Sequence, residues 1–81
     1  MKIKVNFFSY CRDLTGCEHV ETSLPAGRTL GALHEELTRQ FPKLAALKKS
    51  TLLAVGVDYQ TSDYVLKDGE EVSLFPPVSG G

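Results

Sequence analysis

The 81-residue sequence has no tryptophan, one methionine and two cysteines, and its nine Lys and Arg residues nearly balance its ten Asp and Glu residues. A net charge of −1 without a basic cluster gives no electrostatic reason to expect nucleic acid or an anionic membrane as a partner. No apolar run approaches the length of a membrane-spanning helix, and no secretory signal pattern opens the chain. We therefore expect a cytoplasmic protein with one small core.

Patterns typical of catalytic and metal sites are also missing. Cys11 and Cys17 have neither C-x-x-C spacing nor a nearby pair of histidines, so we expect two reduced thiols and no metal. His19 and His34 are isolated in sequence, and we expect both at the surface. The segment 27–31 lacks the spacing and the lysine of a phosphate-binding loop. The sequence therefore predicts no active site of its own and no bound cofactor.

The sequence does contain the alternation of apolar and polar residues that is typical of half-buried strands. Residues 2–8 alternate in this way, and residues 18–24 do so again, which predicts an antiparallel pair. The almost wholly apolar run of residues 52–57 predicts an interior strand. A last strand is expected after the tight turn at Asp68-Gly69, with Val72 on its inner face.

One long helix and one short helical turn are predicted between these strands. Thr29 is a good N-cap, and Pro42 ends the helix because the residue before a proline is pushed out of the α region. The stripe of this helix consists of Leu30, Leu33, Leu37 and Phe41. Residues 9–16 predict the short turn, with Ser9 able to cap it and Gly16 closing it.

The order of elements predicts an α+β fold of the β-grasp type, a mixed sheet with one main helix packed on one face. Its first and last strands lie parallel in the centre, because the helix supplies the long crossover that parallel neighbours need. We expect a single domain of residues 1–76 and a flexible tail of residues 77–81.

The tail combines a stiff exit with a slender tip. Pro76 and Pro77 fix the backbone and end the preceding strand, whereas Gly80 and Gly81 are thin enough to enter a narrow channel. The order of these parts, a hydrophobic strand followed by two prolines and then two glycines, predicts a tail that is presented to another protein. The alternative is an idle, frayed end.

Two aromatic residues fall on the polar side of their strands. Phe8 shares parity with Lys2 and Lys4, and Phe75 shares parity with Glu71. If the first and last strands are neighbours, the two rings meet on the open face where the tail leaves. Such a pair is a candidate docking patch, since aromatic contacts dominate interface energetics. The alternative is that they are ordinary surface aromatics.

These residues resemble the small, sulfur-carrying subunit of molybdopterin synthase, and the likeness spans essentially the whole chain. The matching segments are Ile3-Lys4-Val5-x-Phe7-Phe8, Arg12-Asp13-Leu14-x-Gly16, Thr29-Leu30 with Leu33, and Leu66-x-Asp68-Gly69-Glu70-Glu71-Val72 with Pro76-Pro77-Val78-Ser79-Gly80-Gly81. The chain departs from the family pattern at Val55-Gly56-Val57-Asp58, before Tyr59. The resemblance implies a ubiquitin-like β-grasp fold.

By this resemblance, the carboxylate of Gly81 is adenylated by a ubiquitin-activating-like adenylyltransferase, which uses ATP, and a sulfur donor then converts it to a thiocarboxylate. The chain would next dock on the large subunit of molybdopterin synthase and deliver sulfur to cyclic pyranopterin monophosphate. Arg12 is carried over as a partner contact, together with Phe8, Phe75, Pro76, Pro77, Val78, Ser79 and Gly80. A carrier for thiamine or tRNA thiolation, a ubiquitin-like protein modifier and a plain binding module are alternatives.

Overall fold

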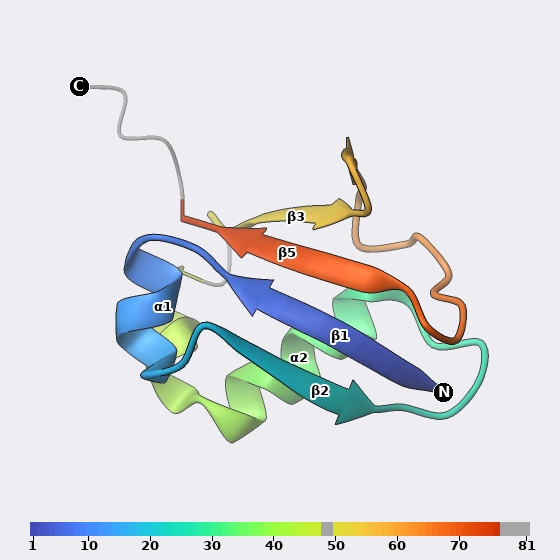
Figure 1. Ribbon diagram of the computed structural model, residues 1–81, viewed down its shortest axis with the longest axis horizontal. Coiled ribbons are helices and arrows are strands. Elements are labelled where there is room, and N and C mark those ends of the chain that lie inside the picture. The colour runs from blue at the N-terminus through green and yellow to red at the C-terminus, as the bar shows by residue number, and fades with distance from the viewer. Residues whose placement is uncertain (48–49, 77–81) are drawn as a thin grey trace.

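A computed structural model describes residues 1–47 and 50–76, which form a mixed sheet with helices on one side (Figure 1). The elements are β1 (Lys2–Phe7), α1 (Tyr10–Thr15), β2 (His19–Ser23), α2 (Leu30–Gln40), η1 (Pro42–Leu47, a 3₁₀ helix), β3 (Leu52–Val55), β4 (Asp58–Tyr59) and β5 (Glu71–Phe75). The five-stranded sheet has the order β2-β1-β5-β3-β4. β1 and β5 are parallel, and the other pairs are antiparallel. The predicted β-grasp architecture is confirmed.

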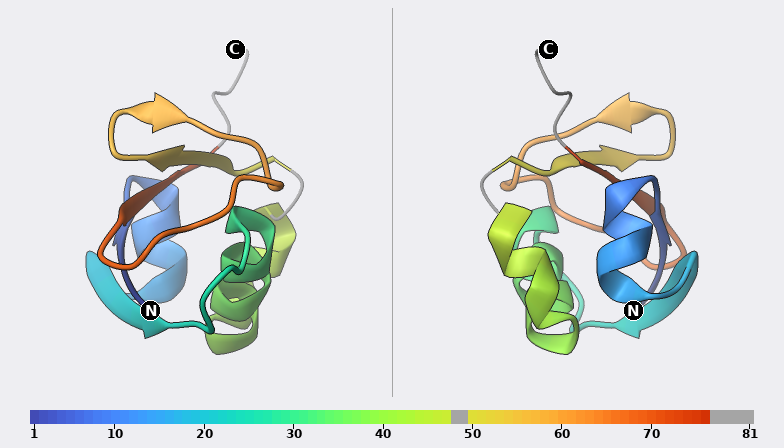
Figure 2. Two further views of the ribbon diagram at one scale, coloured as in Figure 1. Left: turned by 90° about the vertical axis from the view of Figure 1, so that its right-hand side faces the viewer. Right: turned by 90° about the vertical axis from the view of Figure 1, so that its left-hand side faces the viewer.

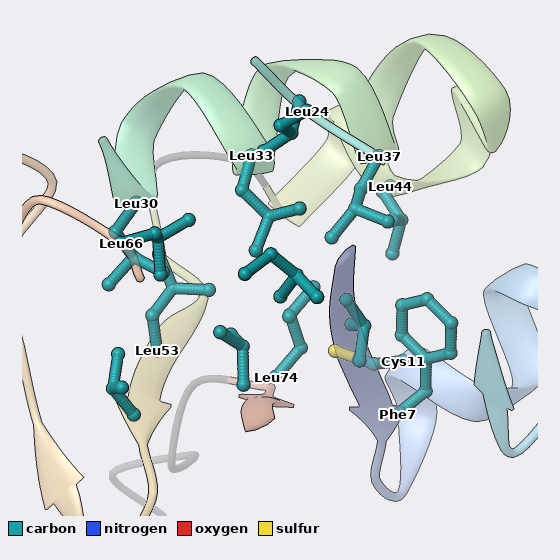
Figure 3. Packing of buried hydrophobic residues seen from close by; sticks show 14 residues of the cluster. Phe7, Cys11, Leu24, Leu30, Leu33, Leu37, Leu44, Leu53, Leu66 and Leu74 are labelled. Atoms are coloured by element: carbon teal, nitrogen blue, oxygen red, sulfur yellow. The ribbon is translucent and has the colours of Figure 1, made fainter. Parts of the chain in front are cut away.

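The core lies between the sheet and α2 (Figure 3). Ile3, Val5 and Phe7 point from β1 toward the helix, as the period-two pattern predicts, and all three are buried. The helix contributes Leu30, Leu33 and Leu37, which are fully buried. Figure 2 shows α2 to one side of the strands, while the described residues place no helix over the opposite face. One face is thus covered and the other is open.

The start of α2 is fixed by its cap and by a distant loop. The Thr29 Oγ1 accepts a hydrogen bond from the backbone N–H of Ala32 at 3.2 Å, as predicted for an N-cap. The N–H of Leu30 donates to the carbonyl of Tyr64, and the N–H of Gly31 donates to that of Ser62, each at 2.8 Å. These bonds satisfy amide groups that have no partner within the helix, so the segment before β5 holds the helix against the sheet.

The hairpin between β3 and β4 shortens the strand that was predicted over residues 52–57. Val55 and Asp58 form the closing pair, which leaves Gly56 and Val57 as a two-residue turn. Gly56 takes a φ of 61°, as the first turn position of a type II′ hairpin requires. The strand therefore ends at Val55, and Val57 is 95% exposed at the tip instead of lying inside the sheet.

Two further expectations need correction. His34 was expected at the surface, yet it is only 7% exposed, because it follows Leu33 on α2 and lies beside the buried stripe. Ser9 precedes α1 but makes no capping hydrogen bond through its side chain; its backbone turns with a positive φ instead. His19 is exposed, and Cys11 and Cys17 are free thiols, as expected.

The end of the chain is described as far as Pro76, directly after β5. The division into a domain of residues 1–76 and a tail of residues 77–81 stays a prediction, because those last five residues lie outside the described part.

Candidate functional site

Phe8 and Phe75 meet on the open face of the sheet, as their parity predicts. The parallel register pairs Phe7 with Leu74, so the next residue of each strand also falls side by side. The N–H of Phe8 donates to the carbonyl of Leu74 at 3.1 Å and continues this ladder. The two rings are stacked, with centroids 4.8 Å apart and an angle of 11° between their planes. The predicted meeting of these rings is confirmed, while their role in docking stays a prediction.

Tyr59 joins this pair from β4 and was not predicted. Its ring lies edge-on to Phe75, with centroids 6.1 Å apart and an interplanar angle of 65°. Ala54 of β3 pairs with Tyr59, and β3 lies between β4 and β5, so the tyrosine ring contacts Phe75 across β3. The signal in the sequence was the two-residue turn at Gly56-Val57, which pairs Tyr59 with Ala54 and places both on the open face. We call Phe8, Phe75 and Tyr59 the aromatic cluster.

The aromatic cluster presents apolar surface to the outside. Phe8 is 43% exposed and Tyr59 is 67% exposed, while Phe75 between them is half-buried. Leu52, which pairs with Phe75 in the neighbouring strand, is also exposed. Aromatic rings of this kind contribute large contact areas with little loss of conformational entropy, which is why they are common at binding hot spots. The arrangement suits the docking of another protein.

Charged residues occupy the opposite end of the same open face. Lys4 Nζ lies 3.5 Å from Glu71 Oε2, and Lys2 Nζ lies 3.9 Å from Glu21 Oε1. All four side chains are more than half exposed, so each pair adds little to stability. The open face is therefore divided into an ion-paired end near the start of β1 and an aromatic end where β5 stops.

The other predicted contact residues lie beside the aromatic cluster, away from it, or outside the described part of the chain. Arg12 lies on α1, where its Nη1 is 3.6 Å from Glu18 Oε1 in an exposed ion pair, and it makes no ring contact with the aromatic cluster. Pro76 is half-buried and follows Phe75 directly. The predictions for Pro77, Val78, Ser79, Gly80 and Gly81 fall on residues outside the described part of the chain.

The titratable groups with shifted pKa values lie in other segments. The hydrogen bond from Tyr64 Oη to Glu70 Oε2, at 2.7 Å, raises the pKa of the tyrosine. The hydrogen bonds from Arg39 lower the pKa of Glu36 on α2. Within residues 1–47 and 50–76, no group of three or more His, Cys, Asp or Glu side chains could hold a metal ion. No helix in these two ranges is long and apolar enough to cross a membrane.

Comparison with known proteins identifies the family. A sequence profile of the ThiS family matches residues 5–81. The molybdopterin synthase sulfur carrier subunit of Escherichia coli is 40% identical over 81 residues, which cover 98% of this chain and 99% of that protein. The structure of a putative molybdopterin converting factor, subunit 1, from Pyrococcus furiosus superposes with a TM-score of 0.88 at 32% identity, covering 96% of this chain and 99% of that one.

A third similarity concerns the fold alone, because the identity is 24%. It is to a chain in the protein-protein complex of subunits 1 and 2 of molybdopterin-converting factor from Helicobacter pylori, with a TM-score of 0.70 and full coverage of both chains. The profile match and the identity to the Escherichia coli protein both extend over nearly the whole sequence. This chain belongs to the ThiS family and, within it, groups with the molybdopterin synthase sulfur carrier subunits.

Proposed function

We propose that this chain is the sulfur carrier subunit of molybdopterin synthase and that Gly81 carries the sulfur. The observation that carries the proposal is the stacked pair of the exposed Phe8 and the half-buried Phe75, at the point where β5 ends. The 40% identity to a protein of that name supports the assignment. A carrier needs a surface that positions it on other enzymes, and the aromatic cluster supplies one.

The proposed chemistry begins at the carboxylate of Gly81. An activating enzyme of the ubiquitin-activating type joins this carboxylate to the AMP moiety of ATP, and pyrophosphate leaves. A donor then supplies a sulfide equivalent whose sulfur bonds to the acyl carbon as AMP leaves, which yields a thiocarboxylate. Activation is needed because a carboxylate oxygen is a poor leaving group, whereas AMP is a good one. The proposed location is the cytoplasm.

In the second stage the loaded carrier docks on the large subunit of the synthase. One sulfur passes from Gly81 to the pterin precursor, cyclic pyranopterin monophosphate, and water restores the carboxylate, so two loaded carriers supply the two sulfur atoms of the molybdopterin dithiolene. The folded domain takes no chemical part in either transfer. The role of the domain is to hold the carbonyl of Gly81 next to its acceptor. Holding two reacting groups together in this way lowers the activation barrier of the reaction. The aromatic cluster would bury its rings against the large subunit, while the narrow Gly80-Gly81 tip enters the active site.

Two measurements test this proposal in sequence. Intact-mass analysis after incubation with the activating enzyme, ATP and a sulfur donor should show one oxygen of Gly81 replaced by sulfur. The matched control is Gly81→Ala, whose added Cβ atom should hinder entry into a narrow channel and so reduce the sulfur incorporated. An unchanged mass of the parent protein would count against any carrier function. The thiocarboxylate form is then mixed with the large subunit and the pterin precursor, and molybdopterin formation separates this pathway from thiamine or tRNA thiolation. Transfer of the whole chain to lysines would instead indicate a protein modifier.

A further inference from the structure

The two edges of the sheet differ in length. β4 has two residues at one edge, whereas β2 has five at the other (Figure 1). The register of β2 on β1 runs without a bulge from Ser23, opposite Lys2, to His19, opposite Asn6, and β2 contains no proline. Short strands, bulges and prolines are common devices that keep a sheet edge from accepting another strand. β2 has none of these three, so its edge is open to a further strand.

The register also shows which backbone groups of β2 point outward. The N–H of Leu24 donates to the carbonyl of Met1 at 2.9 Å, and bonded pairs alternate with non-bonded pairs in an antiparallel ladder. The even-numbered residues of β2 therefore bond to β1. The outward N–H and C=O groups belong to His19, Glu21 and Ser23, which are all exposed. Within residues 1–47 and 50–76, no loop or side chain provides these outward groups with a hydrogen-bond partner.

A groove of about 370 Å³ lies beside the end of this edge. It is lined by residues that directly follow β2 and by one side of α2, namely Leu24, Pro25, Arg28, Ala32, Glu36 and Arg39. Since Leu24 is the next residue after Ser23, the groove begins where the edge ends. An extended segment that pairs with β2 would therefore continue into the groove.

Arg28 is the unmatched charge of this groove. It is exposed and forms no ion pair within residues 1–47 and 50–76. Arg39, in contrast, donates two hydrogen bonds to the carboxylate of Glu36, at 3.1 and 2.5 Å. Glu35, the other carboxylate of the lining, also has a partner. The groove therefore offers one cation to a carboxylate from outside.

We propose that β2 and this groove bind an extended segment of a partner protein, which adds a strand to the sheet and places an acidic side chain against Arg28. Main-chain hydrogen bonds to His19, Glu21 and Ser23 would supply affinity, and alternate side chains would supply specificity. On the side of the sheet that faces α2, Val20 is half-buried against the core. This position favours apolar side chains at alternate positions of the bound segment.

This surface is separate from the aromatic cluster. Ser23 lies opposite Lys2 at the start of β1, whereas Phe8 follows the end of that strand. The groove and the aromatic cluster are therefore at opposite ends of β1. Tyr59 is farther still, since β4 forms the other edge of the sheet. Both surfaces can be occupied at once, so binding at β2 is independent of the proposed sulfur transfer.

The test uses the peptide Asp-Thr-Val-Thr-Val-Thr-Asp, acetylated and amidated at its ends. In an extended conformation its valines and aspartates share one face, and an aspartate at each end can meet Arg28 in either strand direction. Titrated into the full, isotope-labelled chain, the peptide should cause saturable shifts of the NMR amide signals of His19, Glu21 and Ser23.

N-methylation of the peptide tests strand addition without altering the protein. Two versions carry methyl groups on alternate residues. One version should raise the Kd at least about tenfold, because it removes the donors that face β2, while the other should bind within about threefold of the unmethylated peptide.

The contact with Arg28 is tested by a paired change. Replacing both aspartates of the peptide by asparagine, or introducing Arg28→Gln, should raise the Kd about two- to fivefold, as for an exposed ion pair. The two changes together should cause no further loss. The control variant is Lys43→Gln, which removes an exposed cation on η1, beyond the opposite end of α2, and should bind the peptide as the parent does.

Four outcomes would overturn the inference. The first is a titration without saturable shifts at β2. The second is an equal loss from both methylated peptides, which would indicate binding without strand addition. The third is an Arg28→Gln effect that persists with the asparagine peptide, because Arg28 would then not meet the carboxylate. The fourth comes from sedimentation of the parent protein alone: self-association that the peptide displaces would assign the edge to a second copy of the chain.

Discussion

The two faces of the sheet use large apolar side chains in different ways. On the covered face, Leu33 and Leu37 of α2 are fully buried in the core between the helix and the sheet, where they exclude water. On the open face, Phe8 and Phe75 stack on each other and keep part of their surface exposed. Apolar surface that is buried beneath α2 stabilises the fold. Apolar surface that stays exposed on the stacked pair can instead be removed from water when a partner binds, and so can contribute to binding. Substitutions on the two faces should therefore separate stability from docking.

The largest effect on stability is expected on the covered face. Leu37→Ala should lower the free energy of unfolding by about 2 to 5 kcal/mol, because it leaves a cavity beneath α2. The matched control is Leu52→Ala on the open face. Its free energy of unfolding should fall by about 1 kcal/mol or less, since the side chain already contacts solvent. Urea denaturation measures both. Equal losses at the two positions would contradict the distinction between the faces.

The largest effect on docking is expected at Phe75. Phe75→Ala should weaken binding to the large subunit by about 2 kcal/mol or more, as for other buried aromatic anchors. Its free energy of unfolding should change much less than the loss of about 3 to 5 kcal/mol that is typical of a core phenylalanine. Phe7→Ala, on the covered side of the adjacent strand, provides that core comparison. Isothermal calorimetry measures the binding and urea denaturation measures the stability. If Phe75→Ala loses as much free energy of unfolding as Phe7→Ala, the Phe75 ring contributes to the core and not to the open face.

The ion-paired end of the open face should matter least for docking. Lys4→Ala removes an exposed pair with Glu71 and should alter the free energy of unfolding by about 1 kcal/mol or less. The Kd for the large subunit should stay within about twofold of that of the parent, and it should depend little on salt, because the aromatic cluster carries no formal charge. Titrations at low and high ionic strength test this. A strong salt dependence that Lys4→Ala abolishes would extend the docking surface to the charged end.

The smallest effect concerns the covered face at alkaline pH. Burial raises the pKa of the Cys11 thiol above its ordinary value of 9.0. Below that pH the thiol is protonated in both the folded and unfolded states, so its contribution is fully present. As the pH rises further, the unfolded thiol ionises first and stability is lost. The urea midpoint of the parent should therefore fall more between about pH 9 and pH 10.5 than that of Cys11→Ala. Identical slopes would exclude this thiol as the cause.

Much of the fold follows from local patterns in the sequence. The alternation of Ile3, Val5 and Phe7 predicts the covered face of β1, and Thr29 predicts the start of α2, because both depend on neighbours along the chain. The stacking of Phe8 on Phe75 also follows, once the parallel pairing of the first and last strands is inferred from the crossover.

Three features were missed because they depend on tertiary structure. Tyr59 reaches the aromatic cluster through the pairing of β4 with β3, and that register depends on the turn at Gly56. His34 is buried because the width of the covered stripe depends on what packs beside Leu33, not on its own residue type. The positive φ of Ser9 has no local signal, since serine before a helix ordinarily predicts a capping side chain.

The most direct test of the account is sulfur transfer by matched carriers. Thiocarboxylated parent, Phe75→Ala and Lys4→Ala proteins are each mixed with the large subunit and the pterin precursor, and molybdopterin formation is followed at rising concentrations of carrier. The account predicts that Phe75→Ala needs at least about tenfold more carrier for half-maximal rate, in line with a docking loss above 1.4 kcal/mol, while Lys4→Ala matches the parent. Equal carrier requirements for all three proteins would contradict the claim that the aromatic end of the open face guides sulfur delivery.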